Sequence, residues 1–122
     1  MSEIQYEYTV AGKRVTLKKA LPAKEAHLLP KLLLSYDGDT DIIRNMGQIA
    51  IESWEFNGDP KDARAYAGMD IFDELYPLGK ALINYINARM AAAQEAMAKL
   101  ESPTLQLFKH IVHQLLLQVL NQ

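Results

Sequence analysis

Three aspartates alternate with small residues in a segment that could bind a cation. Asp37, Asp39 and Asp41 have the spacing of the first ligands of a calcium-binding loop. Such a loop also needs a glycine at its sixth position and a bidentate glutamate at its twelfth, where this chain has Ile42 and Gln48. Because the ligand set is incomplete, we predict a solvated turn whose polar side chains cap the following helix.

Histidines and nucleophiles are too sparse to build another metal or catalytic centre. His110 and His113 could share one helix face, but most zinc sites need at least three protein ligands, and His27 lies far away in the sequence. The chain has no cysteine, no G-x-S-x-G sequence and no phosphate-binding glycine loop. We therefore predict no metal or other cofactor and no enzymatic activity.

The composition is ordinary for a globular protein. The 122 residues are 49% hydrophobic and 23% charged, and the formal net charge is -2. Nucleic-acid-binding proteins usually show a basic excess, which this chain lacks. No apolar run approaches the roughly 20 residues that span a bilayer, and no leader sequence is visible. These features predict a cytoplasmic protein that binds neither nucleic acid nor membrane.

The N-terminal segment has the alternation of a β-hairpin. Apolar and polar residues alternate up to Val10, which is the pattern of a half-buried strand. Residues 12–13 offer a two-residue turn with glycine first. This turn would place Val10 opposite Val15 and Tyr8 opposite Leu17, with all four side chains on one face.

Helical spacing dominates the middle of the chain. Residues 23–36 are interrupted by Pro30, which predicts two short helices or one kinked helix. Apolar residues then recur every three or four positions within residues 40–54, which predicts one helix ending in tryptophan. The longest helical pattern follows, with Asp70 as its expected N-cap and Pro77 as the point where it kinks or restarts.

The C-terminal segment is helical in pattern and unusually apolar. Its wide apolar face comprises Leu105, Phe108, Ile111, Val112, Leu115, Leu116, Val119 and Leu120. This face either closes the core of the domain or docks on a partner or a second copy of the chain. The polar positions carry glutamine and histidine with Lys109 as the one firm charge, which disfavours a helix lying on a membrane.

These patterns predict a predominantly helical α+β fold, in which an N-terminal β-hairpin is followed by four or five helices. A single domain over residues 1–122 would comprise the hairpin (1–20), a helical body (21–100) and the C-terminal apolar helix (101–122). We expect such a protein to act by hydrophobic docking between helices. The candidate contact residues are Leu82, Ile86, Met90, Phe108, Ile111, Leu115 and Leu116.

Three stretches of the chain resemble the tail assembly chaperones of long-tailed bacteriophages. The first joins VTLKK (15–19), at the end of the hairpin, to LPAKE (21–25). The second is IESWEFNGDP (51–60), and the third is MDIFDELYPL (69–78). The resemblance extends over roughly residues 5 to 95 and leaves out the C-terminal helix.

The resemblance implies a non-enzymatic protein of the infected host cytoplasm. It implies binding to the tape measure protein before the tail tube polymerises, recruitment of the major tail tube protein, and self-association. Two other functions stay open: a structural tail-completion or connector protein of the virion, and a small dimeric bacterial regulatory adaptor. An enzyme of unrecognised type is a further alternative, which a polar pocket with convergent ionisable side chains would favour.

Overall fold

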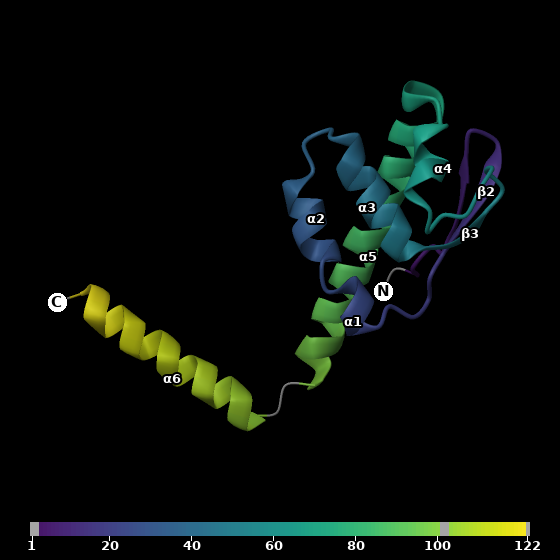
Figure 1. Ribbon diagram of the computed structural model, residues 1–122. Helices are drawn as coiled ribbons and strands as arrows, with labels where there is room; N and C mark the ends of the chain where they lie inside the picture. The colour runs from purple at the N-terminus through teal and green to yellow at the C-terminus, as the bar shows by residue number, and fades with distance from the viewer. Residues whose placement is uncertain (1–2, 101–102, 122) are drawn as a thin grey trace. The chain divides into compact units, whose positions relative to one another are not determined.

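The computed structural model describes residues 3–100 and 103–121 and has the predicted fold class. It is α+β and predominantly helical, with an N-terminal antiparallel hairpin followed by helices (Figure 1). The chain divides into two compact units, Met1–Met90 and Ala91–Gln122. The expectation of a single domain over residues 1–122 stays a prediction.

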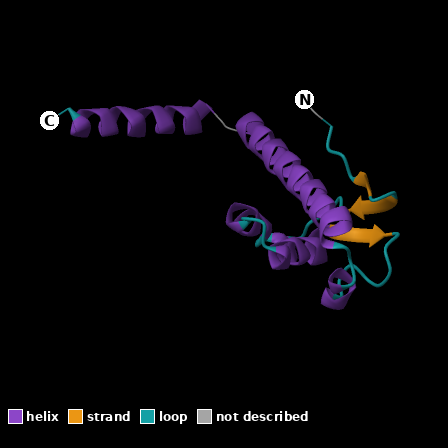
Figure 2. Cartoon of the chain, turned by 90° about the horizontal axis from the view of Figure 1, so that it is seen from above, coloured by secondary structure: helices purple, strands orange, loops and turns teal. Residues whose placement is uncertain are grey.

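The first unit contains a three-stranded antiparallel sheet in the order β1-β2-β3 (Figure 2). β1 (Glu7–Val10) and β2 (Lys13–Leu17) are joined by a turn at Ala11 and Gly12. The φ angles of these two residues are 52° and 77°, both positive, as a type I′ turn requires. Such a turn matches the right-handed twist of the strands that it joins.

The register of the hairpin differs from the predicted one by two residues. Val10 pairs with Lys13 and Tyr8 pairs with Val15, so the expected pairs of Val10 with Val15 and Tyr8 with Leu17 are wrong. The expected face is nevertheless correct, because a shift of two residues keeps every side chain on its own side of the sheet. Val10, Val15 and Leu17 are buried and Tyr8 packs against them.

The third strand replaces the last turn of a predicted helix. α3 (Thr40–Ala50) ends directly before β3 (Ile51–Trp54), so the prediction of one helix over residues 40–54 is wrong at its C-terminal end. β3 pairs with β2, and Trp54 lies opposite Val15. The backbone groups of β3 thus bond to a strand that is distant in sequence, which helical spacing does not reveal.

Among the described residues, four α-helices precede the long helix of the first unit, and two of them have an aspartate cap. α1 (Ala23–Ala26) and α2 (Leu29–Ser35) are separate, with Pro30 in the first turn of α2, so the prediction of two short helices is confirmed. The carboxylate of Asp39 accepts a hydrogen bond from the backbone of Asp41 and caps α3. α4 (Ala63–Ala67) is capped in the same way by Asp62.

The long helix begins with a widened turn. η1 (Ile71–Leu75) is a π-helical turn that leads into α5 (Tyr76–Leu100). Its backbone bonds reach five residues back, as from Leu75 to Asp70 at 2.8 Å. Proline lacks an N–H, and inside a regular α-helix its ring clashes with the carbonyl group four residues earlier. Pro77 is the second residue of α5, and the π-helical turn comes directly before this helix. This geometry agrees with the predicted restart at Pro77.

α5 packs against both α3 and the sheet (Figure 2). A Cβ atom on Gly79 would lie 2.8 Å from Cδ1 of Ile43, so the two helices are in close contact there. Further along α5, the Tyr85 hydroxyl donates a hydrogen bond to the carbonyl oxygen of Lys18. The largest fully buried side chains of this unit are Val15, Leu17, Ile43, Met46, Ile51, Leu78, Leu82 and Tyr85.

The second unit contains the last part of α5 and a further helix, α6 (Pro103–Leu120). The predicted C-terminal helix is therefore present. Residues 101, 102 and 122, within the predicted bounds of this helix, lie outside the described residues.

Candidate protein-binding surface

One face of α6 presents large apolar side chains to solvent. Phe108 is 62% exposed, and Leu115 and Leu116 are 56% and 57% exposed. We call this set the α6 surface; it comprises Phe108, Ile111, Val112, Leu115, Leu116, Val119 and Leu120. A contiguous apolar surface on a protein commonly marks a site of contact with another molecule.

The α6 surface follows from spacing along a helix. Its members step by three or four residues, as in Phe108, Ile111 and Leu115, and a period near 3.6 keeps them on one side. Phe108, Val112, Leu115 and Val119 also alternate four- and three-residue steps, which is the spacing of a coiled-coil seam. The arrangement is therefore suited to contact with another helix.

The sequence-predicted contact residues fall into two groups. Phe108, Ile111, Leu115 and Leu116 are on the α6 surface and exposed. The other three belong to the first unit. Leu82 and Ile86 lie in its core and are 0% and 2% exposed, and Met90 is partly buried against this core. Their role in partner contact stays a prediction, although Leu82 and Ile86 lie in the core of the first unit and only Met90 is partly accessible.

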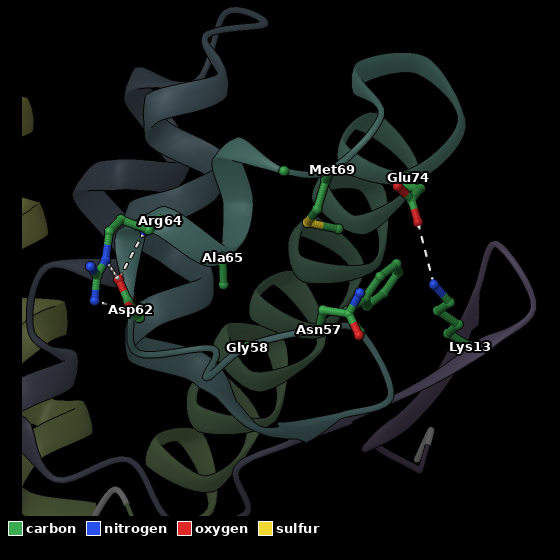
Figure 3. A pocket seen from close by; sticks show the side chains of 10 residues that line it. Lys13, Asn57, Gly58, Asp62, Arg64, Ala65, Met69 and Glu74 are labelled. Atoms are coloured by element: carbon green, nitrogen blue, oxygen red, sulfur yellow. Dashed lines mark hydrogen bonds and ion pairs between the residues drawn. The ribbon is translucent and has the colours of Figure 1, made fainter.

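A hollow of about 520 Å³ lies between the hairpin tip, α4 and η1 (Figure 3). Nζ of Lys13 lies 3.7 Å from a carboxylate oxygen of Glu74 and 4.9 Å from the ring centre of Phe56. On the other side of the hollow, Arg64 and Asp62 form an ion pair at 2.9 Å. Arg64, chiefly through this hydrogen bond, lowers the pKa of the Asp62 carboxyl. Carboxylates in the wall of the hollow thus pair with both cations. No local sequence pattern predicts this hollow, because its walls come from segments that are distant along the chain.

The aspartates that were candidate cation ligands stabilise the local structure around α3. Asp39 caps α3, and Asp41 forms an ion pair with Arg44 at 2.9 Å. His110 and His113 lie exposed on α6. Within residues 3–100 and 103–121, no group of three or more His, Cys, Asp or Glu side chains is arranged to hold a metal ion.

Aromatic side chains fill the space between β3 and α4. The Trp54 ring lies 5.4 Å from that of Phe56 and 5.0 Å from that of Tyr66, measured between centroids. The Trp54 indole donates to the carbonyl oxygen of Gly58, and the Tyr66 hydroxyl donates to that of Pro60. Burial, with a smaller effect of the Asp59 charge, raises the pKa of Tyr66. These contacts join β3 to α4, and Phe56 also lines the hollow beside Lys13.

Two further observations concern membrane-spanning helices and similarity to known proteins. Among the described residues, no helix has both the length and the apolar character that crossing a bilayer requires. Comparison of the chain with protein-family models, with curated proteins and with solved structures finds no match. The α6 surface is therefore the feature from which a function is inferred.

Proposed function

We propose that this protein is a non-enzymatic binding protein that uses the α6 surface to cover an apolar helical segment of a partner. The observation that carries the proposal is the exposure of seven large apolar side chains along one face of a single helix. Burying each such side chain contributes about 1.5–3 kcal/mol, so even partial coverage gives a large driving force for association.

Helix stability supports the same interpretation. Isolated helices become marginal in water below about 12–15 residues, and most helical stability in proteins comes from packing an amphipathic face. α6 has 18 residues, and its apolar side chains remain exposed within the second unit. A partner that covers the α6 surface would therefore stabilise the helix and the complex together.

The particular function that we propose is that of a phage tail assembly chaperone in the host cytoplasm. The resemblance of residues 15–25, 51–60 and 69–78 to that family supports it, together with the α6 surface. A tape measure protein has long apolar helical stretches that aggregate when exposed, and a helix with an apolar face covers them reversibly. In this proposal the chain also self-associates and helps to recruit the major tail tube protein.

Co-purification with the tape measure protein of the same genome tests the proposal. The wild-type chain should retain the tape measure protein in soluble form. Leu115→Glu should abolish this retention, because it places a charge in the α6 surface, whereas Gln114→Glu adds the same charge at the neighbouring polar position and should not. Failure of the wild-type chain to bind the tape measure protein would contradict the proposal.

A second measurement separates the chaperone from a virion component. An assembly chaperone leaves before the tail is complete, so mass spectrometry of purified particles should not detect this chain. Its presence in particles in proportion to structural proteins would instead favour a tail-completion or connector protein.

A further inference from the structure

A second hollow in the first unit, of about 400 Å³, has a positively charged wall. Its lining residues come from the segment after β2, from β3 and from the turn before α4, and they are Lys18, Lys19, Ala20, Glu52 and Lys61. Three lysines thus share the wall with one glutamate, in a chain whose formal net charge is -2. The charge of this hollow is therefore opposite in sign to that of the whole chain.

Hydrogen bonds hold the backbone in both segments that carry the lysines. The Tyr85 hydroxyl, from α5, donates to the carbonyl oxygen of Lys18. The Gln48 side-chain amide, from α3, donates to the carbonyl oxygen of Lys61 at 2.9 Å. Because the two segments are fixed in this way, a ligand that uses all three lysines has little backbone left to order.

The existing contacts of the lysines leave donors for a ligand. Nζ of Lys18 lies 3.9 Å from a carboxylate oxygen of Glu25, which is long for a charge-assisted hydrogen bond. Nζ of Lys19 lies 5.7 Å from the ring centre of Tyr6. An ammonium group has three N–H donors, so each lysine can keep its present contact and also donate to an incoming anion.

The composition of the wall favours carboxylates over phosphates. Phosphate sites in proteins commonly use arginine forks or the N–H groups at a helix N-terminus. None of the described residues that line this hollow is an arginine or lies in a helix. A phosphate dianion would also be repelled by Glu52, whereas separate carboxylates along a peptide can each approach a different lysine.

We propose that this hollow binds an acidic segment of another protein, in which two or more carboxylates approach Lys18, Lys19 and Lys61. The site lies in the first unit, is separate from the α6 surface and goes beyond the proposed function. Exposed ion pairs are individually weak and are screened by salt. The contact is therefore transient, sensitive to salt and selective for the charge of the segment.

A fluorescein-labelled peptide of about eight residues, alternating glutamate and glycine, tests the inference with the full-length chain. At low salt, fluorescence anisotropy should show this peptide binding at least about tenfold more tightly than the same peptide with glutamine in place of glutamate. High salt should remove the difference. Equal affinities would overturn the inference, and so would tighter binding of inorganic phosphate or of a DNA oligonucleotide, measured by competition.

Two variants change the charge of the hollow in opposite directions. Lys61→Glu should weaken binding of the glutamate peptide by about tenfold. Lys31→Glu makes the same change in net charge at an exposed residue of α2 outside the hollow, and it should weaken binding much less. Glu52→Gln removes the lining carboxylate and should tighten binding by about threefold, a gain that unfolding cannot produce. Equal losses in Lys61→Glu and Lys31→Glu, or no gain in Glu52→Gln, would overturn the inference.

The hollow and the α6 surface are tested independently. Leu116→Ala alters the α6 surface without changing the charge, so it should bind the glutamate peptide with wild-type affinity. Loss of peptide binding in Leu116→Ala would place the peptide on α6 and overturn the inference, while the proposed function would stand.

Discussion

The backbone of Gly47 in α3 lies directly against the ring of Tyr66 in α4. A Cβ atom on Gly47 would lie 2.6 Å from Oη of Tyr66 and 2.9 Å from Cε2. The ring is only 3% exposed, and its hydroxyl donates to the carbonyl oxygen of Pro60. Because the ring is rigid and held at both its face and its hydroxyl, it does not move aside easily. The glycine therefore sets the distance between α3 and α4.

Gly47→Ala should destabilise the first unit. Alanine favours a helix over glycine by up to about 1 kcal/mol, but overpacking a core costs about 1–3 kcal/mol, so the free energy of unfolding should fall. Urea denaturation followed by circular dichroism measures the change. Gly68→Ala is the control, because a Cβ atom there meets nothing within 4 Å, and it should be neutral or slightly stabilising.

Alkaline pH should unfold the protein partly through Tyr66. Burial and Asp59 raise its pKa above the ordinary value of 10.0, so the folded state holds this proton more tightly than the unfolded state. The resulting stability is complete below pH 10.0 and is lost as the pH rises above that value. Tyr66→Phe should lose about 1 kcal/mol at neutral pH with the hydrogen bond, and its stability should fall less steeply above pH 10.0. Parallel pH profiles of variant and wild type would contradict this role.

Asp70 should stabilise the start of the long helix. Its carboxylate accepts hydrogen bonds from the backbone of Phe72 at 3.0 Å and Asp73 at 2.8 Å, and its own N–H donates to Glu74 at 2.8 Å. Asp70→Ala should therefore lower the free energy of unfolding by about 1 kcal/mol, as loss of an N-cap usually does. Thermal unfolding compared with Asp73→Ala, which removes an acid from the same turn but no cap, checks the assignment. Equal losses in the two variants would indicate a general charge effect instead.

Truncation of two leucines should separate stability from binding. Leu82→Ala should destabilise the first unit by about 2–5 kcal/mol, because it opens a cavity in the core. Leu116→Ala should change stability by less than about 0.5 kcal/mol, since its side chain is 57% exposed, yet it should weaken partner binding. Calorimetric unfolding and the co-purification assay together measure both effects. A large loss of stability in Leu116→Ala would show that α6 closes a core.

Local signals in the sequence predicted the elements whose hydrogen bonds are local. Three such features are the capping aspartates before α3 and η1, the separation of α1 from α2 just before Pro30, and the inward face of the hairpin. The strand β3 was missed because Ile51 and Trp54 continue the helical spacing of α3. Their backbone groups find partners in β2, far away along the chain.

The same distinction between local and long-range interactions applies to the candidate binding residues. The sequence by itself determined that α5 and α6 are helices with apolar stripes, because helical periodicity is a property of neighbouring residues. Only the tertiary structure decided that Leu82 is enclosed while Leu115 is exposed, since burial depends on which other elements fold against a stripe. Two stripes with similar spacing thus acquire different roles, one as the core of the first unit and the other as a surface, and no local pattern distinguishes them.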